Sequence, residues 1–200
     1  YPFWHDHRLK ITDSEMTELC RAALWYSDHV EITDTKLHGI KALRECGEVA
    51  MRGCDIISPE FGWSVHGIKM EDCTAESEYF MMRSTDLHFR NVQMKGKYSF
   101  QYTENVTIKD SNLDTKDAFW HSKNVTVENS VVKGEYLAWF SDGLTLINCK
   151  IIGTQPLCYC KNLTLINCTM EDTDLSFEYS DVKADIRGSI LSVKNPKSGT

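Results

Sequence analysis

Apolar residues return to the same place along the chain every nineteen residues. The hexapeptide Leu-Thr-Leu-Ile-Asn-Cys occurs at 144–149 and again at 163–168. With the first residue of this unit as offset zero, that offset falls in ten successive units on Leu9, Val30, Val49, Ile68, Leu87, Val106, Val125, Leu144, Leu163 and Ala184. The first and last intervals are 21 residues and the seven between them are 19. A fixed period of this length indicates a solenoid.

Each unit contains two short segments with the pattern of half-buried strands. Offsets zero and two are apolar in every unit and offset one between them is mostly polar, which is the alternation of a strand. Offset seven is apolar again and offset five is small, which indicates a second inward-facing strand. Offset four is only Gly, Asn or Asp, the residues that best tolerate left-handed backbone, so we expect a sharp corner there. Stacked Asn side chains at this corner can hydrogen-bond from coil to coil.

The rest of the unit predicts a third side. Offset nine is mostly Gly, Ser or Thr and gives a second corner, and offset eighteen, with Gly67, Asp86 and Asn105, gives the corner that closes the loop. Between them, offsets eleven to sixteen predict an aromatic-rich strand, as in Tyr79–Ser84. Three strands and three corners in nineteen residues make one coil of a parallel β-helix. We predict an all-β protein: one right-handed parallel β-helix domain of about ten coils over 1–193, and a C-terminal tail over 194–200 that leaves or caps the last coil.

Several phrases resemble a known family. They are Tyr-Pro-Phe-Trp-His at 1–5, Ala-Ala-Leu-Trp-Tyr-Ser at 22–27, Gly-Glu-Tyr-Leu at 134–137, Gly-Thr-Gln-Pro-Leu-Cys-Tyr at 153–159 and Ser-Val-Lys-Asn-Pro at 192–196. They are similar to the domain of unknown function 3737 family, and the coil with its Asn corner resembles the pectin-lyase-like superfold. The resemblance implies a bacterial protein with further coils upstream of Tyr1, and it brings no established activity.

All five tryptophans lie at offset fourteen when it is counted back from the next coil: Trp4, Trp25, Trp63, Trp120 and Trp139. They form either an external ladder that stacks sugar rings or a layer of core, and we favour the core because Trp buries a large apolar area. Arg44 and Gln101 share the column and count against burial.

If the tryptophans are inward, offsets eleven, thirteen and fifteen face solvent and form a strip of aromatic and ionisable groups. Met81, Phe100 and Phe119 at offset thirteen belong to the strip under this interpretation. Exposed apolar patches with a polar rim mark interaction sites. The candidate ligand-binding residues of this strip are Tyr79, Arg83, Tyr98, Tyr102, Asp117, His121 and Tyr136.

The first functional hypothesis is a ligand-binding solenoid, with carbohydrate as the ligand class and without established catalysis. The alternative is a polysaccharide lyase or glycoside hydrolase with a non-standard site. A glycosidase needs two carboxylates about 5–10 Å apart, whereas Glu60 and Asp117 lie three coils apart, roughly 14 Å. A lyase needs a basic residue beside a calcium-binding carboxylate cluster, and Arg83 has no such cluster in the strip. A third hypothesis is a scaffold that forms homo-oligomers through the strip.

The amino-acid composition argues against some classes of binding partner. A net charge of −7 with mixed signs argues against nucleic acid and anionic membrane, and no apolar run approaches a membrane span. The eight cysteines include no Cys-x-x-Cys pair, so we predict no structural zinc, no cofactor and free thiols in a bacterial cytoplasm. Cys54 with Cys73 and Cys149 with Cys168 are stacked in neighbouring coils, either as disulfides or as buried thiols. His5, Asp6 and His7 alternate between strand faces, so we assign no metal site to them.

Overall fold

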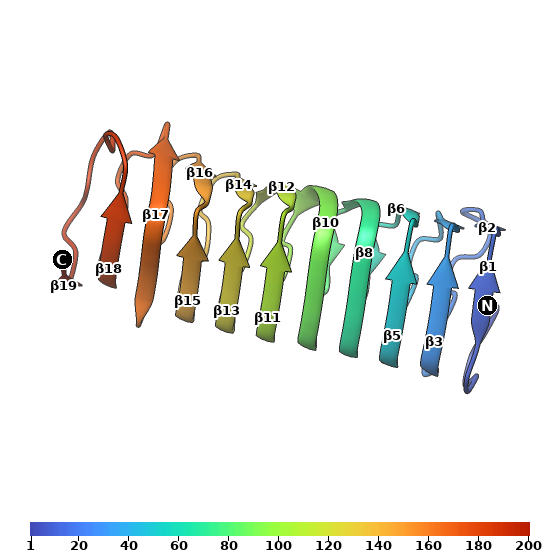
Figure 1. Cartoon of the computed structure of the whole chain (residues 1–200). Coiled ribbons are helices and arrows are strands. Elements are labelled where there is room, and N and C mark those ends of the chain that lie inside the picture. The colour runs from blue at the N-terminus through green and yellow to red at the C-terminus, as the bar shows by residue number, and fades with distance from the viewer.

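The computed structural model describes residues 1–200 as a regular stack of coils with no helix. The near side of the stack in Figure 1 is one parallel sheet that runs the length of the molecule. Its strands are β1 (Lys10–Thr12), β3 (Asp28–Thr33), β5 (Gly47–Arg52), the first half of β8 (His66–Ser77), the first half of β10 (Thr85–Lys97), β11 (Glu104–Lys109), β13 (Lys123–Glu128), β15 (Asp142–Ile147), the first half of β17 (Leu163–Glu171), β18 (Asp181–Ile186) and β19 (Ser198–Gly199). We call this the front sheet. The chain ascends the front sheet and returns behind it while it advances from the N- to the C-terminus, which is a right-handed winding (Figure 1).

A second parallel sheet follows the first around each coil. It consists of the second halves of β8, β10 and β17 together with β2 (Glu15–Met16), β4 (Lys36–Leu37), β6 (Asp55–Ile57), β12 (Asn112–Lys116), β14 (Val131–Lys133) and β16 (Lys150–Ile152). The register confirms the predicted period, because Val106 pairs with Val125 and Ile108 with Val127, nineteen residues apart. The right-handed parallel β-helix of about ten coils is therefore confirmed.

The period was assigned wrongly in the last coil. Val182, and not Ala184, pairs with Leu163, so the last interval is 19 residues and the irregularity lies later, between Leu165 and Cys168. Residues 194–200 follow as part of one further, shorter turn, in which Asp181 pairs with Ser198 of β19. This turn covers β18, whose outer backbone groups would otherwise have no partner.

The corner at offset four adopts the predicted left-handed backbone. Asp110, Asn129 and Asn148 have φ values of 51°, 50° and 52°. Their side chains form a ladder on the outside of the coil, in which the Asn129 amide donates to Asp110 Oδ1 (3.4 Å) and the Asn148 amide donates to Asn129 Oδ1 (3.0 Å). The Asn167 amide donates in turn to Asn148 Oδ1 (2.6 Å), and in every step the later coil donates to the earlier one. The predicted ladder is confirmed.

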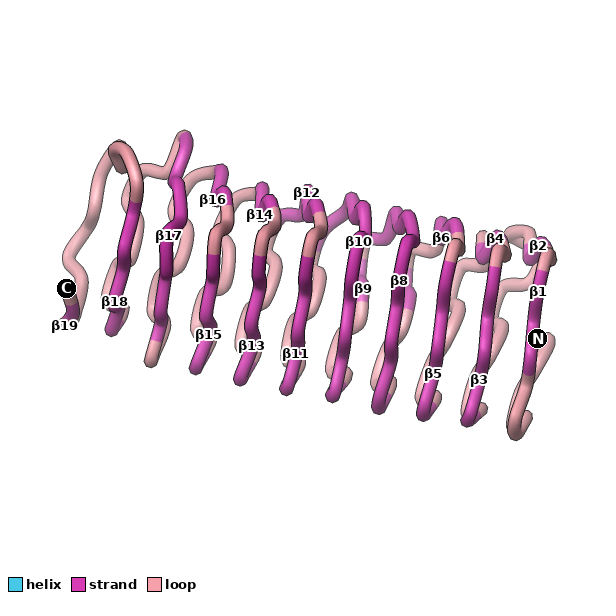
Figure 2. Tube along the Cα trace, in the orientation of Figure 1, coloured by secondary structure: helices cyan, strands magenta, loops and turns pink.

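The third side of the coil is not the strand that we predicted. The only strands there are β7 (Glu60–Phe61) and β9 (Tyr79–Phe80), which pair with each other. Isolated bridges such as Trp25–Arg44 add to them, and most of the far side is loop (Figure 2). Met81 and Arg83 both have left-handed backbone, with φ of 57° and 58°, and the equivalent residues of the other coils repeat this. A left-handed residue breaks the alternation of side chains, so offsets twelve, thirteen and sixteen point inward and offsets eleven, fourteen and fifteen point outward.

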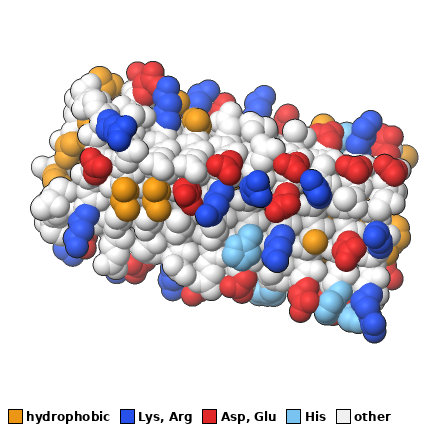
Figure 3. All heavy atoms as spheres, in the orientation of Figure 1, with side chains coloured by type: hydrophobic (Ala, Val, Ile, Leu, Met, Phe, Trp, Pro, Cys, Tyr) orange, Lys and Arg blue, Asp and Glu red, His pale blue; other side chains and the backbone are white.

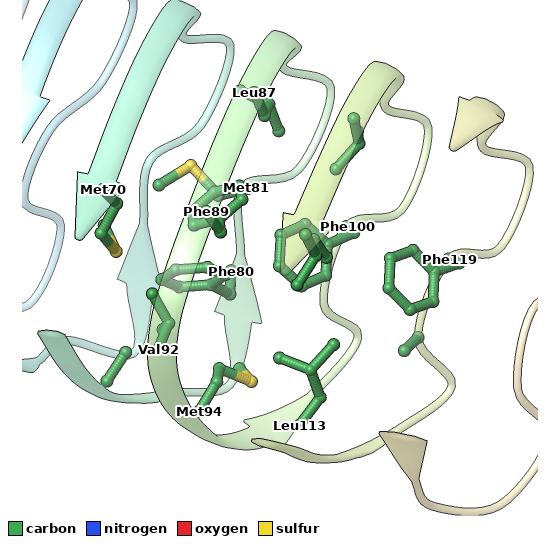
Figure 4. Close-up of a cluster of buried hydrophobic side chains, with 14 of the residues drawn as sticks. Met70, Phe80, Met81, Leu87, Phe89, Val92, Met94, Phe100, Leu113 and Phe119 are labelled. Atoms are coloured by element: carbon green, nitrogen blue, oxygen red, sulfur yellow. The ribbon is translucent and has the colours of Figure 1, made fainter. Parts of the chain in front are cut away.

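The core is a continuous column of apolar side chains that fills the inside of the coils. Phe61, Phe80, Phe100 and Phe119 are fully buried at its centre. The Phe100 ring lies 5.3 Å from Phe80 and 5.0 Å from Phe119, measured between ring centroids (Figure 4). Stacked and edge-to-face aromatic pairs at these distances add to the apolar area that each ring removes from water. The prediction that Phe100 and Phe119 face solvent is therefore wrong, and Met81 is also fully buried.

All eight cysteines are free thiols, and seven of them are buried. The stacked positions are therefore buried thiols and not disulfides. In one stack the Cys54 amide donates to Cys73 Sγ (3.4 Å). The hydrogen bond between the two thiols lowers the pKa of Cys54 to about 7 and raises that of Cys73. No helix of the structure has the length and hydrophobicity to cross a membrane.

Candidate functional site

Aromatic side chains gather on the outward columns of the third side. We define the aromatic face as the exposed and half-buried rings at offsets eleven, fourteen and fifteen of the central and C-terminal coils: Trp63, Tyr79, Tyr98, Tyr102, Trp120, His121, Tyr136, Trp139, Phe140, Tyr159 and Tyr179. The front sheet seen in Figure 3 is different, because acidic and basic side chains alternate over it and few hydrophobic ones interrupt them. The third side is thus the part of the surface where planar apolar groups are concentrated.

Six planar groups of the aromatic face lie one above another, one in each coil. We call this row the outer ladder: Arg83, Tyr102, His121, Phe140, Tyr159 and Tyr179. The Arg83 guanidinium lies 5.8 Å from the Tyr102 ring, and the rings that follow are 5.0, 4.9, 4.9 and 5.9 Å apart, with interplanar angles of 8 to 17°. The ladder is open to solvent, since Tyr102 is 51% exposed and Tyr179 is 59% exposed. A row with this spacing exists because each coil repeats the previous one at the distance between neighbouring strands.

The tryptophans form a second row, between the core and the outer ladder. Four of them are half-buried and Trp4 is exposed, so they are not internal, contrary to our interpretation. Each indole N–H donates to a backbone carbonyl of the next coil, as Trp63 does to Tyr79 (3.1 Å) and Trp120 does to Tyr136 (2.7 Å). Buried Trp N–H groups need such a partner. Trp120 and Trp139 stack at 5.3 Å with an angle of 2° between their planes.

Three residues interrupt the tryptophan row, Arg44, Met82 and Gln101, and two of them perform the same tasks with other chemistry. Gln101 Nε2 donates to the Asp117 carbonyl (2.9 Å), which replaces the indole hydrogen bond. The Arg44 guanidinium lies between Trp25 and Trp63, at 5.0 and 4.8 Å from the two ring centroids. A cation over an aromatic face is attracted to the negative face of the ring, so Arg44 continues the stack.

The seven predicted site residues lie in two outward rows of the third side. Tyr79 and Tyr98 stack on each other at 5.0 Å in the row at offset eleven, and the Lys116 ammonium lies 5.3 Å from the Tyr136 ring. Arg83, Tyr102 and His121 belong to the outer ladder. Asp117 differs, because its side chain is buried. Phe140 and Tyr159 also belong to the outer ladder, although they are not among the seven predicted residues. Their position at offset fifteen, shared with Tyr102 and His121, could have identified them. Tyr179 was missed because it lies 20 residues after Tyr159, one more than the period of the repeat.

Asp117 is a buried carboxyl group at the edge of the aromatic face. Burial raises the pKa of Asp117 above its usual value, the Lys116 ammonium lowers it in part, and the Glu135 carboxylate raises it further. The Lys116 ammonium itself forms an ion pair with Glu135 (3.1 Å). The carboxylate form of Asp117 therefore destabilises the native state.

We expect Asp117→Asn to raise the free energy of unfolding at neutral pH, since the amide carries no charge to bury. The native pKa of Asp117 is above its unfolded value, so the penalty is fully present above the native pKa and disappears as the pH falls below the unfolded one. The stability gain of Asp117→Asn over the wild type should therefore shrink as the pH falls. Urea unfolding at a series of pH values measures it. Asp114→Asn is the matched control, because the Asp114 side chain is half-exposed and paired with Lys133 (3.0 Å), so removal of its charge should bring no gain in stability. A destabilised Asp117→Asn protein would contradict the assignment.

The fold and the site together define the class of this protein: a right-handed parallel β-helix with an external aromatic face on its loop-rich side. The chain belongs to the family described as protein of unknown function (DUF3737), whose model matches residues 1–200. The match confirms the family resemblance seen in the sequence phrases. No curated protein matches the chain.

Proposed function

We propose that this protein is a ligand-binding solenoid, and that its aromatic face binds a carbohydrate chain that lies along the axis of the coils. The observation that carries the proposal is the outer ladder, which repeats one exposed planar group per coil from Arg83 to Tyr179. A surface with a short axial repeat matches a polymer with a short repeat better than it matches a small, compact ligand. The kinship with the pectin-lyase-like superfold that the Asn corner suggests is part of the same proposal.

The chemistry of the face favours a ligand that is both hydroxylated and apolar. Near-parallel stacking covers much of each ring face in the outer ladder, so a ligand meets mainly ring edges and the polar groups of Tyr102, His121 and Tyr159. Tyrosine hydroxyls donate and accept hydrogen bonds, and the ring beneath offers apolar contact. A sugar ring presents the complementary set, with hydroxyl groups around an apolar carbon frame.

Charge favours a neutral or weakly charged chain. The formal net charge of the protein is −7, so a polyanion is repelled at long range. Arg83 at one end of the outer ladder is the only Arg, Lys, Asp or Glu residue in it. A neutral polysaccharide fits this distribution.

Affinity electrophoresis in gels that contain neutral or acidic soluble polysaccharides tests the proposal. We expect a neutral polysaccharide to retard the wild type, and the double variant Tyr102→Ala/Phe140→Ala to bind about tenfold more weakly or worse, as for truncated aromatic anchors. The matched control is Ile57→Ala/Ile166→Ala, which removes apolar side chains that are 47% and 45% exposed outside the aromatic face. The control should bind like the wild type.

Three other outcomes contradict the proposal. Mobility that no polysaccharide changes removes the carbohydrate ligand. Shortened chains after incubation with the protein favour the enzyme hypothesis over simple binding. A dimer in light scattering that Tyr102→Ala/Phe140→Ala converts to a monomer assigns the face to contact between copies of this chain.

A further inference from the structure

Three metal-ligand side chains converge at the N-terminal end of the front sheet, outside the aromatic face. His7, Asp28 and His29 each offer one ligand atom, and these atoms all lie within 4.8 Å of one another. In Figure 3, histidine, acidic and basic side chains crowd the lower N-terminal corner of the front face. The arrangement joins the first two coils, because His7 and Asp28 are 21 residues apart, the length of the first interval.

The stacking of coils brings the three residues together. His7 and Asp28 are partners in a parallel bridge, so their side chains lie one above the other. His29 follows Asp28 with left-handed backbone (φ 52°), and this turns its ring back toward the Asp28 carboxylate. The His7 and His29 rings lie 5.0 Å apart at 68°, on the same side of the corner. The backbone therefore places the three side chains next to one another.

Glu48 orients the His29 ring. Its carboxylate lies 2.8 Å from His29 Nε2, and a carboxylate accepts but does not donate. In the neutral imidazole the proton is then on Nε2, and Nδ1 carries a free lone pair. Carboxylates that hold the outer nitrogen of a metal-bound histidine in this way are typical of metal sites.

The free lone pair of His29 points at another acceptor. Nδ1 lies 3.6 Å from Asp28 Oδ1, and the same oxygen is hydrogen-bonded to His7 Nδ1. Two acceptors that face each other repel, unless a proton or a metal cation lies between them. A ligand set of two imidazoles and a carboxylate is suited to zinc and neighbouring transition metals, and not to magnesium or calcium.

We propose that His7, Asp28 and His29 form a zinc-binding site, with Glu48 as the positioning residue of His29. Zinc bonds of about 2.0–2.2 Å place tetrahedral ligands about 3.4 Å apart, so the side chains must shift by about 1 Å, and the hydrogen bond between His7 and Asp28 must open to admit the ion. They are free to do so, because the three side chains are 52%, 50% and 47% exposed. Three protein ligands leave a fourth position for water. The ion joins the first coil to the second.

Calorimetric titration of tag-free, chelator-dialysed protein with zinc chloride at neutral pH tests the site. We expect one zinc ion per chain with a dissociation constant in the micromolar range. His7→Gln and His29→Asn should weaken binding at least tenfold, and Asn tolerates the left-handed backbone at position 29. Glu48→Gln should weaken binding about tenfold, as loss of an outer carboxylate partner does.

The matched control is His38→Gln. His38 also pairs with a carboxylate, Asp55 at 2.9 Å, but has no second histidine beside it. This variant should bind zinc like the wild type. Saturating zinc should also raise the melting temperature of the wild type and of His38→Gln but not that of His29→Asn, since a ligand of the native state stabilises it. A wild type without a binding isotherm, or isotherms that His29→Asn and His7→Gln leave unchanged, would overturn the proposal.

Discussion

Replacement of Phe100 by alanine should lower the free energy of unfolding by about 3–5 kcal/mol, the range for truncation of a buried Phe. Phe100 is 1% exposed and contacts Phe80, Phe89 and Phe119 at centroid distances of 5.0 to 5.3 Å. The cavity lies at mid-length, where coils on both sides hold the backbone in place, so the neighbours have little freedom to collapse into it. Urea unfolding followed by circular dichroism measures the loss.

Phe140→Ala is the matched control for Phe100→Ala. The two residues lie two coils apart on the same side, but Phe140 is 44% exposed. Its removal loses the stacking with His121 and Tyr159 and leaves no internal cavity. We expect a loss of about 1 kcal/mol. Equal losses in the two variants would show that the phenylalanine column is not the centre of the core.

Substitution of Gly96 by alanine should be nearly as damaging, with a loss of roughly 3 kcal/mol from overpacking. A Cβ at Gly96 would lie 1.7 Å from the backbone oxygen of Ser77, a position that real Cβ atoms do not occupy. The obstruction is backbone of the neighbouring coil, so β8 and β10 must separate before the methyl group fits. A lower urea midpoint with an unchanged m-value is the expected signature.

Gly47→Ala provides the comparison for Gly96→Ala. A Cβ at Gly47 meets only ordinary contacts, the nearest being the His66 oxygen at 3.8 Å. This variant should be neutral or slightly more stable, because alanine reduces the freedom of the unfolded chain. If both glycine variants unfold at the same urea concentration, the close approach of the coils at Gly96 is not rigid.

The sequence correctly predicted two of the three sides of the coil. The conformation of the third side was not predictable, for physical reasons. At offset four, residues such as Asn129 and Asn148 favour the left-handed backbone that they adopt, so the corner was visible. At offsets thirteen and fifteen the same backbone is adopted by Phe100 and Tyr102, whose side chains do not favour it. Packing of the coils imposes that conformation there, and no local signal shows it.

The candidate sites were likewise predictable from the sequence only in part. Offset columns placed Tyr102 and His121 in one row before the structure was known, because a fixed period is enough to predict stacking. The equivalence of Gln101 with tryptophan was not predictable, since it depends on a hydrogen bond to a carbonyl of the next coil. The 21-residue first interval places His7 beside Asp28 in the next coil, but the approach of His29 was beyond reach because it depends on the left-handed backbone at His29.

The amide ladder at the outer corner makes the solenoid chemically directional. Asp110 can only accept and begins one ladder on the N-terminal side, and Asn129, Asn148 and Asn167 each donate to the residue before. Hydrolysis of the Asn148 amide to a carboxylate, a common form of ageing in proteins, would set two acceptors against each other at one step. The same reaction at Asn129 would remove its hydrogen bond to Asp110, but the new carboxylate could still accept the hydrogen bond from the Asn148 amide. Deamidation therefore weakens the contact with the preceding coil and leaves the contact with the following coil intact. A partly deamidated protein would lose its coil-to-coil hydrogen bonds at particular corners and not uniformly along its length.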